Sequence, residues 1–321
     1  LSWLYGLGVG LRNFLFNQGI LKQQAYPIPL ICVGNITVGG TGKTPHVELL
    51  ISILRKQYRI AVISRGYKRK SRGLREVTLT STAEEVGDEP KQIKQKYPEV
   101  RFIVDGNRRR AMRYLLALPE EERPEVVLLD DGFQHRYVQP SFSILLIDAQ
   151  RELHDDELLP LGGLREPATA RYRADCIILT KCPHDMQPIK LRIMQRNLDL
   201  YAHQEIFFSR IHYQQPRAVR TLLGEAGSPL PKDALVIALS GIASPGLFFS
   251  YLDERYELID QLVYPDHHQF RRKDFVAISE HWQELCEQHS GRPVYIVCTE
   301  KDAVRFTDSL GELPEELVKQ L

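Results

Sequence analysis

Along most of the chain, short apolar runs alternate with stretches in which apolar residues recur at helical spacing. The apolar runs predict strands at residues 30–33, 60–64, 126–130, 144–148 and 176–180. Helical stretches lie between several of these strands, as at residues 45–56 and 108–118. Because this alternation is typical of a mostly parallel sheet with flanking helices, we predict an α/β fold.

The pattern changes near residues 203–233 and then resumes. Residues 205–212 and 218–223 predict a paired ribbon, and residues 224–233 are rich in glycine and proline. Further on, the sequence predicts strands at residues 235–239, 256–263 and 294–298 and helices at residues 245–252 and 271–289. We therefore place a domain boundary near residue 215, which separates a core of residues 26–215 from a smaller α/β domain of residues 216–321.

The first 25 residues form an element of their own. Apolar side chains recur at helical spacing at Leu4, Leu7, Leu11, Phe14 and Leu15. Polar residues interrupt this run before it reaches the ~20 apolar residues of a spanning helix, and the segment lacks the basic leader and cleavage site of a secretory signal. We predict an amphipathic helix that either lies in the headgroup plane of a membrane or packs on its own domain.

Composition narrows the function classes. Lys and Arg number 42 against 41 Asp and Glu, so the chain lacks the overall positive charge of a dedicated DNA-binding protein. The five cysteines are scattered without a CxxC pair, which argues against a disulfide framework or a structural zinc site and favours a reducing compartment.

The segment between the first strand and the helix at residues 45–56 predicts a phosphate-binding loop. Its glycines let backbone N–H groups approach phosphate oxygens at a helix N-terminus. Lys43 would reach the β- and γ-phosphates, and the Thr44 hydroxyl would bind Mg²⁺. The strict P-loop pattern is broken at its first position, where Thr37 replaces glycine. The predicted nucleotide-binding residues are Thr37, Val38, Gly39, Gly40, Thr41, Gly42, Lys43 and Thr44.

Two adjacent carboxylates lie at the end of the buried-type strand at residues 126–130: Asp130 is its last residue, and Asp131 follows it. At the end of a strand downstream of a phosphate loop, they predict Mg²⁺ binding, directly or through water. Residues 180–183, Thr-Lys-Cys-Pro, lie where many GTPases carry the Asn and Asp that read guanine, and both are absent. The predicted cofactors are therefore ATP and Mg²⁺.

Several strings, in this order, resemble the tetraacyldisaccharide 4′-kinases of lipid A biosynthesis. They are VGNITVGGTGKTP (33–45), SRGYKRK (64–70), GDEP (87–90), DDGFQH (130–135), LLPLGGLREP (158–167), PDHHQF (265–270) and TEKDAVRF (299–306). The resemblance spans nearly the whole chain, and Thr37 is itself typical of the family, whereas Lys68 stands where glycine is common.

The resemblance implies transfer of the ATP γ-phosphate to the 4′-hydroxyl of a tetraacylated glucosamine disaccharide 1-phosphate, giving lipid IVA. It also implies a P-loop NTPase-type core, a smaller C-terminal α/β domain joined by a two-stranded linker, and an N-terminal helix at the cytoplasmic face of the inner membrane. The acylated lipid and that membrane are the implied partners, and neither nucleic acid nor an obligate protein partner is expected.

A sugar hydroxyl needs a base to accept its proton during phosphoryl transfer. The resemblance assigns this role to Asp88, although its position before Glu-Pro alone favours a helix N-cap. Similarity to the family points to His267 as the assisting group, and spacing does not choose between His267 and His268. Lys43 completes the expected catalytic set.

The resemblance further assigns substrate binding to side chains that can neutralise phosphate or line the sugar pocket. These residues are Arg65, Tyr67, Arg108, Gln134, His135 and Arg165. Two other functions stay open at this point. One is an ATPase scaffold that uses ATP to open and close its domains, and the other is a nucleic-acid-binding ATPase that uses the basic run at residues 65–75.

Overall fold

The computed structural model describes residues 1–151, 153, 155–183, 185–219, 221, 229–266, 268–289 and 291–307. The chain divides into two compact units. The first comprises Leu1–Thr80 and Lys96–Ile211, and the second comprises Ser81–Gln95 and His212–Leu321. The segment Ser81–Gln95 therefore groups with the second unit, although the sequence assigned it to the core domain.

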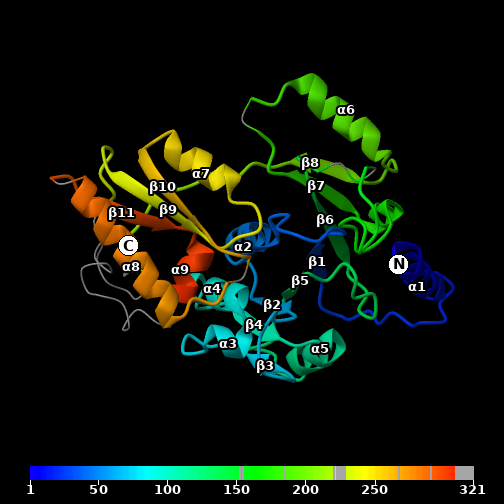
Figure 1. The fold of residues 1–321 in the computed structure, drawn as a ribbon. Coiled ribbons are helices and arrows are strands. Elements are labelled where there is room, and N and C mark those ends of the chain that lie inside the picture. Colours follow the sequence, from blue (N-terminus) through cyan, green and yellow to red (C-terminus); the bar gives the residue numbers. More distant parts are fainter. Residues whose placement is uncertain are drawn as a thin grey trace. The chain divides into compact units, whose positions relative to one another are not determined.

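The described part of the first unit contains an eight-stranded sheet in the order β3-β4-β2-β5-β1-β6-β7-β8. Its strands are β1 (Leu30–Gly34), β2 (Ile60–Ser64), β3 (Arg75–Glu76), β4 (Arg101–Val104), β5 (Val126–Asp130), β6 (Phe142–Asp148), β7 (Cys176–Thr180) and β8 (Glu205–Phe208). The pair β3–β4 is antiparallel, and the other neighbouring strands are parallel (Figure 1). The predicted mostly parallel α/β fold is thus confirmed.

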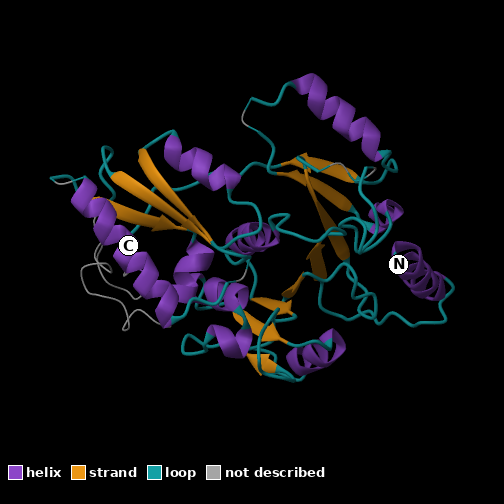
Figure 2. Cartoon of the chain, in the orientation of Figure 1, coloured by secondary structure: helices purple, strands orange, loops and turns teal. Residues whose placement is uncertain are grey.

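Helices accompany these strands, as Figure 2 shows. They are α1 (Ser2–Asn17), α2 (Lys43–Leu54), α5 (Arg108–Leu116), the 3₁₀-helix η1 (Ala168–Arg173) and α6 (Pro188–Leu198). Apolar side chains of α5, such as Met112 and Leu115, pack into one core cluster with Leu30, Ile63 and Leu129 from the sheet. Full burial of the central strands explains why their sequences are continuous apolar runs.

The described part of the second unit contains a three-stranded parallel sheet in the order β10-β9-β11. Its elements are α3 (Ala83–Val86), α4 (Asp88–Lys96, whose last residue belongs to the first unit), β9 (Leu235–Ser240), α7 (Gly246–Asp253), β10 (Glu257–Val263), α8 (Arg272–Gln288), β11 (Val294–Cys298) and α9 (Glu300–Thr307). Alternate residues of β9 enter different cores: Leu235 and Ile237 pack with α8 and α9, whereas Val236 and Ala238 pack with α7. The second, smaller α/β sheet agrees with the expected C-terminal domain.

The predicted two-stranded ribbon was wrong in its first half. Residues 205–208 form β8, which pairs in parallel with β7 at the edge of the large sheet, because the sheet offers the unpaired backbone of β7 as a partner. Residues 211–218 contain no strand, and most of 219–223 lies outside the described residues. Strands β3 and β4 were not predicted from the sequence.

The carboxyl ends of β1 and β5 lie side by side, since Val33 pairs with Asp130. Gly34 closes β1 against the segment that follows Asp131. A Cβ atom on Gly34 would lie 2.7 Å from Phe133 Cβ and 3.0 Å from Phe133 N. Both are closer than side-chain carbons normally approach other atoms, so this junction requires glycine.

We expect Gly34→Ala to lower the free energy of unfolding by about 2 kcal/mol, because the added methyl group overpacks a buried junction that includes backbone atoms. Urea denaturation measures the change. Gly106→Ala is the matched control, because a Cβ there meets no atom of the described residues within 4 Å. Equal stabilities of the two variants would contradict the steric interpretation.

Candidate active site

The predicted phosphate loop connects β1 to α2, and Lys43 and Thr44 are the first two residues of that helix. Gly42 caps the helix with φ 83°, and Gly39 has φ 101°. Both values lie in the left-handed region that glycine adopts at low cost, which accounts for glycine at these two positions. The loop thus presents backbone N–H groups at a helix N-terminus, which is the local structure that binds phosphate.

Neighbouring segments fix the shape of this loop. The Asn35 side chain donates to Thr41 Oγ1 at 2.9 Å, and the Thr180 hydroxyl donates to the Thr41 carbonyl at 3.0 Å. Thr37 forms an antiparallel bridge with Leu164, a residue of the LLPLGGLREP string. On either side of that bridge, Val38 N donates to Gly163 O at 2.7 Å and Arg165 N donates to Ile36 O at 2.7 Å. Hydrogen bonds between backbone groups therefore join the phosphate loop to the LLPLGGLREP string, although the two are far apart in the sequence.

The Asp131 carboxylate forms ion pairs with two cationic side chains, Lys43 and Arg165. Both oxygens of its carboxylate accept from Arg165 Nη1 at 3.2 Å, and Lys43 Nζ lies 3.8 Å from Oδ1. Burial tends to raise the pKa of Asp131, but the charges of Lys43 and Arg165 outweigh this effect and hold the pKa below its usual value. The carboxylate is therefore ionised at neutral pH. Its backbone has φ 49°, a strained conformation that occurs mainly where surrounding contacts enforce it.

The residues assigned to Mg²⁺ offer a chemically suitable donor set. Asp130 ends β5 and is almost fully buried, Asp131 follows it, and Thr44 is the second residue of α2, beside the loop. Mg²⁺ prefers oxygen ligands and is usually held by one or two carboxylates together with phosphate oxygens and water. Among the described residues, no group of three or more His, Cys, Asp and Glu side chains is arranged so that it could hold a metal ion. The donors thus fit a nucleotide-bound Mg²⁺ better than an all-protein metal site.

Arg108 and His135 lie at the same edge of the sheet and are shielded from water. Arg108 is 4% exposed, and its Nη2 donates to the Asp131 carbonyl at 3.5 Å. Burial lowers the pKa of Arg108, while the charges of Asp131 and Asp130 oppose this shift. Burial and the positive charges of Arg108 and Arg12 lower the pKa of His135 to about 4. His135 is therefore neutral at pH 7, and its buried Nε2 has no hydrogen-bond partner among the described residues.

The low pKa of His135 predicts a pH dependence of stability. Between the ordinary value of 6.5 and about 4, the unfolded chain binds a proton that the folded protein does not bind. The free energy of unfolding should therefore fall as pH decreases through this window, and His135→Gln should make the fall shallower. Urea denaturation at a series of pH values measures the slope. An equal change of slope in the control His212→Gln, at an exposed histidine, would contradict this.

Helix α1 packs on the segments that carry these groups. The Tyr5 hydroxyl donates to the Arg165 carbonyl at 2.9 Å, and Arg12 donates to the Gln134 carbonyl at 2.6 Å. Gln134 in turn donates to the carbonyl of Asn35, at the start of the phosphate loop, at 2.6 Å. The large apolar side chains on the other side of α1 are exposed, namely Trp3, Leu4, Leu7, Leu11 and Phe14. Packing on the domain and presentation of an apolar face therefore coexist in one helix.

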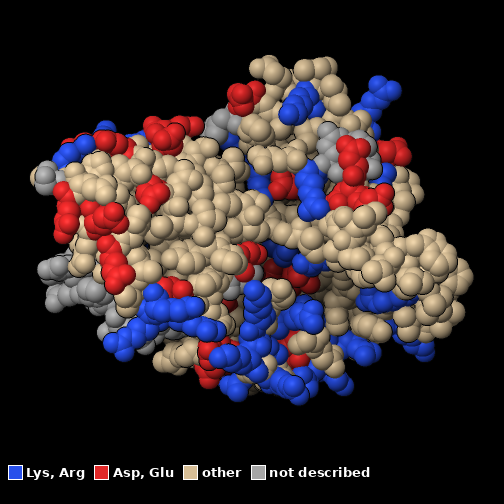
Figure 3. Space-filling view, in the orientation of Figure 1, with Lys and Arg blue, Asp and Glu red and all other residues tan. Residues whose placement is uncertain are grey.

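The basic run after β2 differs from the groups around Asp131 because it is largely exposed. Arg65 and Tyr67 point to solvent, although the charge of Arg65 contributes to the lowered pKa values of Arg108 and His135. Lys68, which stands where the family commonly has glycine, has φ 59°, so this turn uses a left-handed residue without glycine. Figure 3 shows Lys and Arg side chains gathered over the part of the first unit that contains β3 and α5.

Asp88 belongs to the second unit, where it is the first residue of α4. It follows Gly87, whose carbonyl accepts the Lys91 N–H, so Asp88 lies inside the helix instead of capping it. The Asp88 carboxylate accepts from Arg305 Nε at 2.8 Å. Among its predicted assistants, His267 lies outside the described residues, and His268 Nε2 lies 3.1 Å from Asp274 Oδ2 at the start of α8.

Sequence reasoning missed several groups that the structure brings to these sites. Thr180 was considered only as a base-reading position, yet it supports the phosphate loop. His46 was not considered, although its ring contacts the Gly42 carbonyl at 2.7 Å and the Ser209 hydroxyl at 3.0 Å. Arg305 lies within the TEKDAVRF string, which was the signal that could have drawn attention to it.

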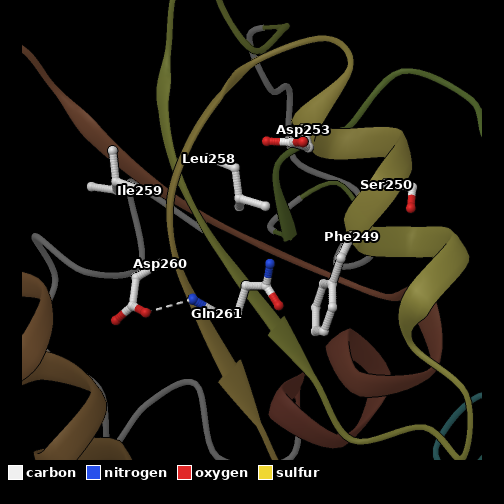
Figure 4. Close-up of a pocket in the computed structure, with 7 residues that line it drawn as sticks. All are labelled: Phe249, Ser250, Asp253, Leu258, Ile259, Asp260 and Gln261. Carbon is white, nitrogen blue, oxygen red and sulfur yellow. Dashed lines mark hydrogen bonds between the residues drawn. The ribbon is translucent and has the colours of Figure 1, made fainter.

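A hollow in the second unit is separate from these groups. It is lined by Phe249, Ser250 and Asp253 of α7 and by Leu258, Ile259, Asp260 and Gln261 of β10 (Figure 4). Gln261 N donates to Asp260 Oδ1 at 2.7 Å, which turns this carboxylate toward its own backbone. The hollow contains none of the predicted site residues, so we assign it no part in the chemistry.

Comparison with known proteins gives the same family as the sequence strings. A family model described as tetraacyldisaccharide-1-P 4′-kinase matches residues 1–317. A tetraacyldisaccharide 4′-kinase from Porphyromonas gingivalis (strain ATCC 33277) is 49% identical over 317 residues, which cover 99% of this chain and 87% of the relative. Another, from Parabacteroides distasonis, is 46% identical over 327 residues, which cover 100% of this chain and 86% of the relative.

A solved structure is similar as well. The crystal structure of the "apo" form of LpxK from Aquifex aeolicus in complex with ATP, at 2.2 Å resolution, superposes with a TM-score of 0.71. It is 29% identical and covers 95% of this chain and 87% of its own. From the full-length family match, the high identity of the relatives and the shared fold, we conclude that the chain belongs to the tetraacyldisaccharide 4′-kinase family and is an enzyme of lipid A biosynthesis.

Proposed function

We propose that the protein transfers the γ-phosphate of ATP to the 4′-hydroxyl of a tetraacylated glucosamine disaccharide 1-phosphate, which gives lipid IVA and ADP. The observation that carries this proposal is the convergence of Lys43 and Arg165 on Asp131, beside a glycine loop at the start of α2. Phosphoryl transfer depends mainly on positioning and on neutralising the phosphate charge. This cluster supplies fixed cations and a phosphate loop for both tasks.

The nucleotide phosphates bind the backbone amides of residues 37–44, and Lys43 contacts the β- and γ-phosphates. Thr44, Asp130 and Asp131 would hold Mg²⁺, which would supply positive charge to offset the negative charge of the phosphates. Arg165 and Arg108 neutralise negative charge on the migrating phosphoryl group or on the 1-phosphate of the lipid. Arg65, Tyr67, Gln134 and His135 bind the acceptor.

The Asp88 carboxylate accepts the proton of the 4′-hydroxyl. As the new bond forms between the 4′-oxygen and the γ-phosphorus, the bond from that phosphorus to the bridging oxygen of ADP breaks. ADP leaves with the electron pair of that bond, and the proton remains on Asp88 until solvent or a neighbouring base removes it. His267 is the proposed neighbouring base.

Helix α1 places the enzyme on a membrane as a peripheral protein. Along the described parts of the chain, no helix is both long and apolar enough to cross a bilayer. The exposed apolar face of α1 suits binding in the headgroup plane instead. Because the acceptor is a lipid and the donor is ATP, we place the protein on the cytoplasmic side of the inner membrane.

The membrane proposal predicts a loss of vesicle binding when the apolar face of α1 becomes polar. We expect the double variant Leu4→Gln with Leu11→Gln to lower the partition coefficient on lipid vesicles at least about tenfold, because each buried leucine contributes roughly 1.5–3 kcal/mol. The control is Leu79→Gln with Ile193→Gln, two residues of similar exposure elsewhere in the first unit. Unchanged sedimentation of the α1 variant with vesicles would place the anchor elsewhere.

The catalytic proposal is tested with labelled ATP, Mg²⁺ and the acylated disaccharide 1-phosphate. We expect a product phosphorylated at the 4′ position, identified by mass spectrometry and phosphorus NMR, formed in equal amounts with ADP. ATP hydrolysis at an equal rate without the disaccharide would instead support an ATPase scaffold. Hydrolysis that needs RNA or DNA, with binding that weakens steeply as salt increases, would support the nucleic-acid-binding ATPase.

A further inference from the structure

Helix α9 begins within the TEKDAVRF string, and its polar side chains contact the first turns of α4, which contains Asp88. Arg305 Nε donates to Asp88 Oδ2 at 2.8 Å. We propose that Arg305 is a positioning residue that holds the Asp88 carboxylate in the orientation needed to accept the substrate proton. This inference rests on the proposed role of Asp88 as the base.

Arg305 is itself rigidly held. It is 9% exposed, and its Nη1 donates to Asp302 Oδ1 at 2.7 Å and to the Gly241 carbonyl at 3.1 Å. One guanidinium therefore bridges two carboxylates, Asp88 through Nε and Asp302 through Nη1. The planar guanidinium fixes the relative directions of these donors, which the flexible ammonium of lysine does not.

Asp302 supplies the fixed end of this chain of contacts. It is fully buried, and its Oδ2 accepts from Gly241 N at 3.0 Å and from the Thr299 hydroxyl at 2.6 Å. Gly241 directly follows β9, so Asp302 is tied to the central strand of the small sheet. A Cβ on Gly241 would lie 2.9 Å from Asp302 Oδ1 and 3.3 Å from Arg305 Nη1, which shows how closely the backbone approaches the pair.

Other residues of α9 fix the same turns of α4. Lys301 Nζ lies 3.1 Å from Glu89 Oε1 and 3.8 Å from Asp266 Oδ1 of the PDHHQF string. Gln92 Nε2 donates to Glu300 Oε2 at 3.3 Å. Three side chains of α9 therefore contact three residues of α4. One of them, Lys301, also contacts Asp266.

A purely structural contact between the two helices would also account for this partly buried ion pair, but it explains the choice of a guanidinium poorly. Taking two charges out of water costs free energy that their attraction often does not fully recover, so apolar residues would hold two helices together as well or better. A guanidinium is justified where a carboxylate must stay in a defined place and orientation. Proton acceptance sets that requirement, since the base must lie within hydrogen-bond reach of the reacting hydroxyl.

The test compares Arg305→Gln, Arg305→Lys and Asp302→Asn in the full-length protein, with acylated disaccharide 1-phosphate and ATP as substrates. We expect kcat to fall about 100-fold in Arg305→Gln, because misplacing a catalytic group by about 1 Å has effects of this size. KM for ATP should stay unchanged. Asp302→Asn should show a smaller fall in kcat, and Arg305→Lys should recover part of the activity. The control is Arg292→Gln, which breaks the exposed ion pair with Glu257.

The pH profile separates positioning from mere stabilisation. Removing a positive charge beside a carboxylate makes that carboxylate easier to protonate, so the acid limb of kcat/KM should move to higher pH in Arg305→Gln. A purely structural role would lower the melting temperature and leave this limb in place. If Arg305→Gln does not fold, Arg305→Lys keeps the positive charge but not the fixed directions of the donors, so kcat should fall while the melting temperature and the acid limb stay close to those of the wild type.

A double-mutant cycle distinguishes failure of this inference from failure of the proposed function. Adding Arg305→Gln to Asp88→Asn should cause no further loss of kcat, because the group that Arg305 positions has already lost its basicity. An inactive Asp88→Asn together with wild-type kcat in Arg305→Gln and Asp302→Asn would overturn the positioning role alone. Full activity of Asp88→Asn would instead overturn the proposed base and, with it, the reason for positioning.

Discussion

Lys43→Met is expected to lower kcat/KM for 4′-phosphorylation by about 10⁴-fold, because fixed cations aimed at the transferring phosphoryl group account for rate effects of this order. Lys43 begins α2 directly after the glycine loop, and its ammonium is held 3.8 Å from the Asp131 carboxylate. Methionine keeps the length and the apolar stem of the side chain and removes the charge. The measurement is the initial rate of lipid phosphorylation over a range of ATP concentrations.

The same substitution also changes Asp131. Without Lys43 the carboxylate keeps Arg165 as its cationic partner, and the charges of Arg165 and Arg108 still lower its pKa. The fold should therefore persist, and a melting temperature near that of the wild type would show this. Lys56→Met removes an exposed lysine just after the same helix and should leave kcat/KM unchanged. A Lys43→Met enzyme within tenfold of wild-type activity would exclude Lys43 from phosphate neutralisation.

The elements predicted best from the sequence are the buried strands, because burial alone requires their residues to be apolar. The strands at residues 60–64, 126–130, 176–180 and 294–298 match β2, β5, β7 and β11 residue for residue. The first three belong to a sheet covered on both faces, so each is an uninterrupted apolar run. The glycine loop was equally readable, because positive φ values at Gly39 and Gly42 restrict the residue type.

The strands that the sequence did not predict correctly form because of the strands with which they pair, and their own sequences carry little signal. β3 has two residues, Arg75 and Glu76, and exists because it pairs with β4. β4 begins with Arg101 and is short, so its four residues give little periodic signal. β8 was predicted as half of a ribbon, since its composition suits any strand pairing and only the position of β7 decides which one forms.

In the candidate site, too, the local sequence predicts some features, and contacts between distant residues decide the others. Asp130 and Asp131 could be placed from the sequence because Asp130 is the last residue of a buried strand and Asp131 directly follows it. The contacts that give these groups their chemistry join distant residues: Arg165 lies 34 positions from Asp131, and Arg305 lies 217 positions from Asp88. Family strings identified Asp88, Asp131 and Arg165 and contained Arg305 without singling it out, but neither spacing nor periodicity could pair these residues. The structure adds these pairings.

Helix α1 shows how two alternative interpretations can both describe one element. Its polar side chains bind backbone carbonyls of Arg165 and Gln134, which explains why the polar residues interrupt the apolar run. Its apolar side chains are left exposed on the other side. A helix that holds the proposed substrate-site segments with one face and exposes an apolar surface on the other suits an enzyme whose acceptor is a lipid.

Asp88→Asn is expected to lower kcat for 4′-phosphorylation by about 10³-fold with little change in KM for ATP, because general bases contribute roughly 10²–10⁴-fold and an amide cannot accept the hydroxyl proton at neutral pH. Asparagine keeps the size of the side chain and one oxygen that can accept from Arg305. The loss should therefore reflect chemistry and not the packing of α4 on α9. Binding of a fluorescent ATP analogue checks that the nucleotide site is intact.

The control for this substitution is Asp253→Asn, which neutralises an exposed carboxylate at the end of α7 in the same unit. It should leave kcat and the melting temperature unchanged. Asp88→Asn should in addition lose the acid limb of the pH–rate profile, since the group that must be deprotonated for activity is gone. An active Asp88→Asn enzyme with the wild-type pH profile would show that the 4′-hydroxyl gives its proton to another acceptor, and the search would then turn to the PDHHQF segment.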